Sequence, residues 1–116
     1  MNQEQQELEI WRAAMVSEVE GSDTRLATRA LLALAYDDPD RRAVEAILLR
    51  QLSPEVDDQL RALAVTCMGH IGRIHQMVSP DVVHRLEGLI DDPALGGRAE
   101  DALDDIRSFA RGNSEL

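Results

Sequence analysis

A helical pattern of small and apolar residues recurs about every 35 residues along this chain. In its clearest copy, a run counted from Arg61 places Ala64, Cys67, Met68 and Ile71 three, six, seven and ten positions further on. On an α-helix these four offsets fall within an arc of about 100°, the width of a stripe that buries against neighbouring elements. A repeat of this length is typical of stacked helix pairs. The pattern therefore predicts an all-α fold.

Two weaker copies flank the clear one, one counted from Arg25 and the other from Gly96. At the same four offsets they carry Thr28, Leu31, Leu32 and Ala35, and Ala99, Ala102, Leu103 and Ile106. We expect the repeat-like helices near residues 24–36, 57–75 and 95–110, within one helical-repeat domain that spans residues 1–116.

Proline, glycine and aspartate separate the predicted helices. Ser53-Pro54-Glu55 and Ser79-Pro80-Asp81 both combine a capping hydroxyl, a proline for the first helical position and an acid near the positive end of the helix dipole. No segment has the pattern of a strand. The predicted helices cover residues 3–19, 24–36, a third segment after Pro39, a fourth that starts between 54 and 58 and ends near 75, 80–90, and 95 or 97 to 110.

Charge limits the classes of partner. The chain has 22 acidic and 12 basic residues and a formal net charge of −10. Nucleic acids and anionic membranes attract basic clusters and repel carboxylates, so neither is expected as a partner, whereas a basic protein is. The polar start of the chain, the single cysteine and the lack of an apolar run of about 20 residues lead us to expect a cytoplasmic protein.

The most reactive side chains lie in residues 67–75. Cys67 shares the apolar arc, so we expect a buried, inert thiol. His70 and His75 are five residues apart, about 140° around a helix, and so cannot ligate one metal ion together. Gly69 and Gly72 lie inside a helix and are interpreted as points of close approach for a neighbouring helix. With no nucleophile-base pair or ligand set, we expect no enzyme activity, no metal and no cofactor.

Carboxylates gather in three places. They occur at residues 37–40, at residues 91–92 and on the predicted last helix from residue 100 to 105. Two interpretations remain open for them, solvated or helix-start acids on the one hand and a partner surface on the other.

Equivalent positions in the three copies suggest a polar strip. His70 and Arg73 stand nine and twelve positions after Arg61 in the middle copy. Asp37 stands twelve positions after Arg25 in the first copy, and Asp105, next to Asp104, stands nine positions after Gly96 in the third. We therefore expect His70 and Arg73 to be flanked by Asp37 on one side and by Asp104 or Asp105 on the other. Arg73 is therefore predicted to pair with Asp37 or Asp105. The strip is either an internal ion-pair ladder that sets helix register or a recognition stripe on the face where repeat proteins bind.

The middle copy, Leu60-Arg61-x-x-Ala64-x-x-Cys67-Met68-Gly69-x-Ile71, resembles the second helix of HEAT repeats. The other two copies lack the glycine, the third also lacks the arginine, and Glu55 stands where the family usually has an aspartate. The resemblance implies a HEAT-like α-solenoid of about three antiparallel helix pairs.

Residues 34–42, 64–75 and 97–106 together resemble small bacterial helical-repeat proteins that serve as immunity proteins of contact-dependent inhibition and other polymorphic toxin systems. Arg41-Arg42-Ala43 departs from that group, in which aromatic residues are common at this turn. The resemblance implies that the chain neutralises a cognate toxin domain by binding it, without chemistry of its own. The acidic charge of the chain would suit a basic toxin domain such as a nuclease, and no small-molecule substrate is expected. The partner-binding residues expected on this basis are Asp37, Asp38, Asp40, His70, Arg73, Asp104 and Asp105. The alternatives are a generic HEAT-type adaptor with another protein partner and, in a different class, an enzyme or cofactor-lyase subunit built on such repeats.

Overall fold

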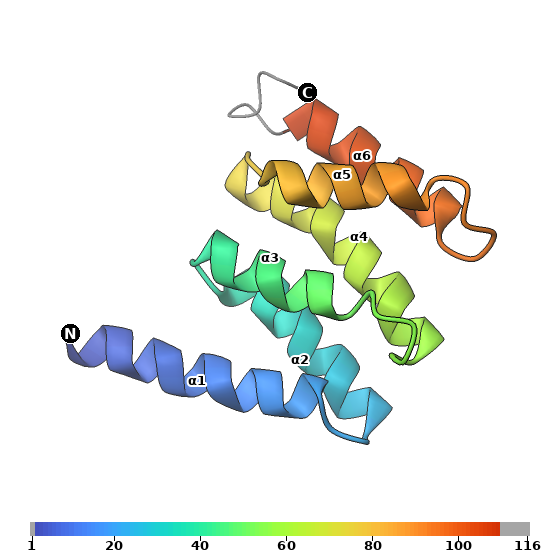
Figure 1. Ribbon diagram of the computed structural model, residues 1–116. Coiled ribbons are helices and arrows are strands. Elements are labelled where there is room, and N and C mark those ends of the chain that lie inside the picture. The colour runs from blue at the N-terminus through green and yellow to red at the C-terminus, as the bar shows by residue number, and fades with distance from the viewer. Residues whose placement is uncertain (1, 110–116) are drawn as a thin grey trace.

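In the computed structural model, residues 2–109 are described, and they form six α-helices and no strand (Figure 1). The helices are α1 (Gln3–Val19), α2 (Thr24–Asp37), α3 (Arg41–Arg50), α4 (Asp58–His75), α5 (Pro80–Leu89) and α6 (Gly96–Phe109). The all-α prediction is confirmed, and the helix bounds agree closely with those expected. Residues 1 and 110–116 of the predicted single domain, including Ala110 of its last helix, lie outside the described residues.

Aspartates begin three of the helices. The Asp23 carboxylate accepts hydrogen bonds from two backbone N–H groups at the start of α2, Asp57 does the same for α4, and Asp40 accepts one from the Ala43 N–H in α3. Each satisfies backbone donors that have no partner inside the helix and places negative charge at the positive end of the helix dipole.

The two Ser-Pro signals behave differently from each other. Pro80 occupies the first turn of α5 as predicted, but the Ser79 side chain forms no cap hydrogen bond. At the other signal, Ser53 donates to Glu55 within a turn, and α4 begins only at Asp58, at the late end of the expected range.

The helices form three antiparallel pairs. Figure 1 shows α2, α4 and α6 side by side and parallel, while α1, α3 and α5 run in the opposite direction. Within this array α1 packs on α2, α3 on α4 and α5 on α6, and α4 also contacts α2 and α6. The Cα extents of 41 × 33 × 17 Å describe a slab thick enough for two helix layers, since packed helix axes lie about 8–10 Å apart.

This arrangement gives the slab two distinct ends. We call the end where α2, α4 and α6 begin the amino end, and the end where these three helices finish the carboxyl end (Figure 1). The α2–α3 and α4–α5 turns also lie at the carboxyl end, because they follow directly from α2 and α4.

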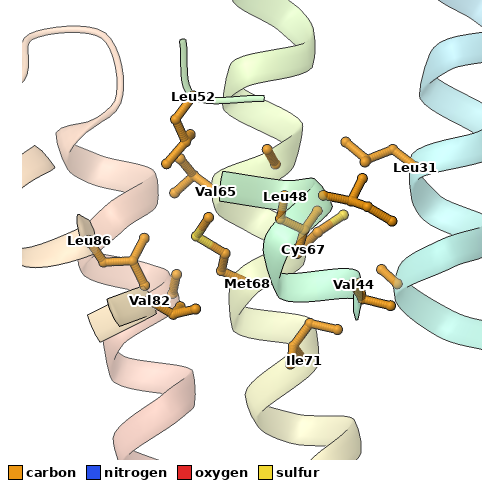
Figure 2. Close-up of a cluster of buried hydrophobic side chains, with 14 of the residues drawn as sticks. Leu31, Val44, Leu48, Leu52, Val65, Cys67, Met68, Ile71, Val82 and Leu86 are labelled. Atoms are coloured by element: carbon orange, nitrogen blue, oxygen red, sulfur yellow. The ribbon is translucent and has the colours of Figure 1, made fainter. Parts of the chain in front are cut away.

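The core surrounds α4. Figure 2 shows Leu31 of α2, Leu48 of α3 and Leu86 of α5 around the buried side chains of α4. Cys67 is one of those side chains and is fully buried, as predicted. Burial in apolar surroundings raises the pKa of its thiol to about 12, so the unreactive thiol form dominates at neutral pH.

Two glycines allow α4 and α6 to approach closely. A Cβ added at Gly72 would lie 2.8 Å from Ile106 Cγ1, and one added at Gly69 would lie 3.1 Å from the Ala102 Cα. Both distances are shorter than an ordinary van der Waals contact. The predicted role of these glycines is therefore confirmed.

The register of the first copy differs from the expected one. The buried residues of α2 are Ala27, Ala30, Leu31, Leu34 and Ala35, whereas Thr28 and Leu32 are only partly buried. The first copy must therefore be counted from Thr24, and the prediction from Arg25 was wrong by one residue. In the corrected register Tyr36, not Asp37, is equivalent to Arg73.

Buried polar contacts hold the two turns at the carboxyl end. Asp38, in the α2–α3 turn, accepts hydrogen bonds of 2.5 and 2.8 Å from Arg12 on α1. Glu45 on α3 accepts bonds from the backbone N–H and hydroxyl of Ser79 in the α4–α5 turn, at 2.8 and 2.6 Å, and from Arg41 at 2.7 Å. In both cases the turn that follows one helix pair is bonded to the first helix of that pair.

Candidate partner-binding surface

The α2–α3 turn separates its three aspartates by environment. Asp38 is 2% exposed, and its carboxylate accepts hydrogen bonds from Arg12 and from the Asp40 backbone N–H. Asp40 is exposed, caps α3 and lies 4.0 Å from Arg12. Asp37, the last residue of α2, is exposed and has no hydrogen-bond or ion-pair partner among residues 2–109. Asp37 and Asp40 are thus accessible to a partner, while Asp38 holds the turn in place.

His70 lies at the centre of a polar group formed by three adjacent helices. Its ring is tilted 33° from that of Tyr36, with centroids 5.2 Å apart, and its Nδ1 contacts the Arg73 guanidinium. The Asp105 carboxylate of α6 lies near Gly69, the residue before His70, since a Cβ added at Gly69 would be 3.2 Å from Asp105 Oδ2, and its charge acts on the His70 ring. The structure therefore brings Tyr36, His70, Arg73 and Asp105 together.

The predicted ion pair of Arg73 is wrong. None of the ion pairs formed by residues 2–109 joins Arg73 to Asp37 or Asp105, and the guanidinium contacts His70 instead. The corrected register of α2 explains the difference, because it places the Tyr36 ring beside α4 where Asp37 was expected. The internal ion-pair ladder is therefore not formed in the part of the chain that the structure describes.

Burial and Arg73 set the charge of this group. The pKa of His70 is lowered below its usual value of 6.5, because burial disfavours the charged ring and Arg73 repels a second positive charge, while Asp105 acts in the opposite direction. At neutral pH the imidazole is therefore neutral.

The aspartates of α6 fall on different parts of the helix. Asp105 is partly buried against α4, whereas Asp104 lies on another face of α6 and is exposed. Neither has a hydrogen-bond or ion-pair partner within residues 2–109. Together with Asp37, they give the carboxyl end three carboxylates that the described residues leave unpaired.

The carboxylates at residues 91–92 have a different role. Asp92 accepts backbone hydrogen bonds from Leu95 and Ala94 at 2.9 and 2.8 Å, which lower the pKa of its carboxyl group below the usual value of 3.8. This residue organises the turn that leads into α6, in line with the helix-start interpretation.

Neither a cluster of metal ligands nor a membrane-spanning helix is found in the described residues. Between residues 2 and 109, no group of three or more histidine, cysteine or carboxylate side chains is placed to hold a metal ion. Nor does any helix in that range combine the length and the apolar character that a membrane crossing requires.

Exposed apolar side chains were missed at the sequence level. Tyr36, Ile74 and Phe109 are 51%, 42% and 45% exposed, and each lies in the last turn of α2, α4 or α6. The sequence could have indicated two of these side chains, because Ile74 and Phe109 stand at the same offset in adjacent copies and outside the buried arc.

An open groove of about 760 Å³ lies at the amino end, between the α1–α2 turn and the α3–α4 loop. Small-molecule sites commonly have volumes of about 300–1,000 Å³. However, Arg50 and Arg85 line this groove together with Glu20, Glu55 and Asp57 around an apolar floor. Mixed charge of this kind favours no single class of ligand, so the groove is not assigned.

Comparison of the chain with protein families, with curated proteins and with solved structures finds no match.

Proposed function

We propose that this chain is an immunity protein that binds and neutralises a basic toxin domain in the bacterial cytoplasm. The observation that carries the proposal is the set of unpaired carboxylates, Asp37, Asp104 and Asp105, at one end of a chain whose net charge is −10. A basic protein would neutralise this charge and would be steered towards it during encounter.

The proposal includes a HEAT-like solenoid. The three antiparallel pairs and the parallel row of α2, α4 and α6 support this architecture, as does the bonding of the α2–α3 and α4–α5 turns to the first helix of the preceding pair. Solenoids of this kind bind proteins across a row of equivalent helices. No reaction is assigned to the chain, and inhibition would result from occupation of the toxin's own surface.

Co-expression tests the proposal. A toxin encoded beside this gene should arrest growth when expressed alone, and this chain should restore growth. The double substitution Asp37→Lys and Asp104→Lys should weaken that rescue, whereas Asp91→Lys, at an exposed acid beyond the end of α5 near the amino end, should not. Circular dichroism of each variant verifies that it remains helical.

The salt dependence of association and the identity of captured proteins test the proposal further. Raising the salt concentration should mainly slow association of the purified proteins, because steering by exposed charge is screened. If the neighbouring gene encodes no toxin and the proteins captured by this chain are neutral or acidic, the immunity function fails and a generic HEAT-type adaptor replaces it.

A further inference from the structure

The carboxyl end carries an apolar surface as well as a charged one. Tyr36, Ile74 and Phe109 are exposed in the last turns of α2, α4 and α6, and Met77 is exposed just beyond α4. Because these three helices are parallel neighbours, their last turns lie at the same end of the slab (Figure 1). Scattered exposed apolar residues are normal, but a group gathered over adjacent elements marks an interaction surface.

The contacts around His70 connect these side chains into one surface. The Tyr36 ring packs against His70, and Ile74 is one helical turn beyond His70 on the same face of α4. On α6, Phe109 is one turn beyond Asp105, whose carboxylate lies beside Gly69. We call Tyr36, His70, Ile74, Asp105 and Phe109 the carboxyl-end patch.

Carboxylates beside the carboxyl-end patch remain unpaired. Asp37 and Asp104 are exposed and have no partner among the described residues, and the last turn of α2 contains no basic residue. The last turn of α2 adds the negative end of its own dipole beside Asp37. Basic side chains lie in the last turns of α4 and α6, where Arg73 contacts His70 and Arg107 lies 3.8 Å from Glu87, so the unbalanced negative charge is at Asp37 in the last turn of α2.

Asp37 stands at a position that disfavours its own charge. A carboxylate in the last turn of a helix is repelled by the negative end of the dipole, and at this position nothing in the described part of the chain neutralises it. A positively charged group from outside would remove this repulsion. A second copy of this chain is disfavoured as the occupant, because two copies would bring like charges together.

We propose that the carboxyl-end patch is a docking surface for a protein segment that carries arginine or lysine beside a large apolar side chain. The apolar side chain of that segment packs between Ile74 and Phe109, and its cation pairs with Asp37 and stacks on the Tyr36 ring. This inference deepens the proposed function by naming the chemistry of the contact, but it does not require the partner to be a toxin.

A peptide titration followed by NMR tests the surface directly. The probe is a twelve-residue peptide of alternating arginine and leucine, added to the isotopically labelled full chain. The largest shift changes should occur at Tyr36, His70, Ile74 and Phe109. A peptide with serine in place of leucine, and one with glutamate in place of arginine, should each bind at least about tenfold more weakly.

Matched substitutions assign the binding to individual side chains. Tyr36→Ser and Ile74→Ser should each weaken binding of the arginine-leucine peptide about tenfold, whereas Ile10→Ser, on the exposed face of α1, should change it less than about twofold. All three positions are exposed, so each variant should keep the helical spectrum that verifies its fold.

Other occupants give distinguishable results, and each would overturn the inference. Shift changes spread over α1 and the amino-end groove would show charge attraction without a docking surface. Changes at the patch on dilution of the chain alone would assign it to a second copy, and contacts from residues 110–116 to Ile74 in the free chain would assign it to the chain's own end. If the neighbouring toxin binds while the peptide does not, the proposed function stands and this inference fails. If the peptide binds at the patch while no neighbouring toxin binds, this inference stands and the proposed function fails.

Discussion

Aspartates at the two ends of the slab have opposite relations to the fold. At the amino end, Asp23, Asp57 and Asp92 accept hydrogen bonds from backbone N–H groups at or before the starts of α2, α4 and α6. At the carboxyl end, Asp37, Asp104 and Asp105 have no such partner among the described residues. Aspartate side chains therefore stabilise the helices at the amino end, whereas these three aspartates at the carboxyl end are free to contact another molecule.

Position along the helix explains the difference for Asp37, the last residue of α2. A carboxylate near a helix start interacts favourably with the positive end of the dipole, and one in the last turn interacts unfavourably with the negative end. Folding alone thus accounts for the amino-end aspartates, but it offers no reason for Asp37. Asp38 and Asp40 are the exceptions at the carboxyl end, since Arg12 neutralises the first and the second caps α3.

The largest effect is expected at Asp38. Asp38→Ala should lower the free energy of unfolding by about 3 kcal/mol, because breaking a buried ion pair leaves the other charge without compensation. The Arg12 side chain keeps 19% of its surface exposed, which limits the loss. Urea denaturation measures both this variant and its neighbour Asp37→Ala, which should not be destabilised. Equal losses at the two positions would remove the distinction between them.

A smaller loss is expected where an aspartate caps a helix. Asp57→Ala should cost about 1 kcal/mol of stability, because the backbone N–H groups of Gln59 and Leu60 lose their acceptor. Asp104→Ala, at an exposed position within α6, should change stability by less than about 0.5 kcal/mol. Thermal unfolding of both variants provides the measurement. A loss at Asp104 as large as that at Asp57 would show that the carboxyl-end acids also support the fold.

The sequence was sufficient to locate the helices, because prolines, glycines and capping aspartates mark their ends and the spacing of apolar residues marks their buried faces. It was not sufficient to set the register of α2, where the arcs through Ala27 and Leu31 and through Thr28 and Leu32 both satisfy helical spacing. Packing against α1 and α4 decides between these arcs, and packing is not encoded in local periodicity.

The polar contacts that distinguish buried from free carboxylates could not be predicted from the sequence either. Arg12 and Asp38 are 26 residues apart, and Glu45 and Ser79 are 34 apart. In the sequence, Asp37, Asp38 and Asp40 form one acidic run; only the fold shows that Asp38 is buried and Asp37 is not. The candidate site could therefore be located to a turn, but its accessible members could not be identified.

A gain in stability is expected at Asp37. Asp37→Asn should raise the free energy of unfolding by about 0.3–1 kcal/mol at low salt, because it removes a negative charge from the negative end of α2. The gain should shrink as salt screens the dipole. Asp81→Asn, in the first turn of α5, is the control and should have the opposite sign. If Asp37→Asn also weakens binding of the arginine-leucine peptide, the residue favours recognition at the expense of stability; a destabilised variant would contradict this.

The smallest effect concerns the protonation of His70. Because the folded chain lowers the pKa of this imidazole, the unfolded chain binds the proton more readily between the folded value and 6.5. The stability that neutral His70 contributes is therefore fully present above pH 6.5 and is lost as the pH falls through the folded pKa. NMR titration of the ring should show Arg73→Ala raising the pKa of His70 and Asp105→Asn lowering it further, since one removes a repelling charge and the other an attracting one. The His84 resonance, from an exposed position on α5, serves as the control within each sample. If Asp105→Asn left the His70 titration unchanged, the carboxylate of α6 would not belong to the group around His70, and the carboxyl-end patch would end at α4.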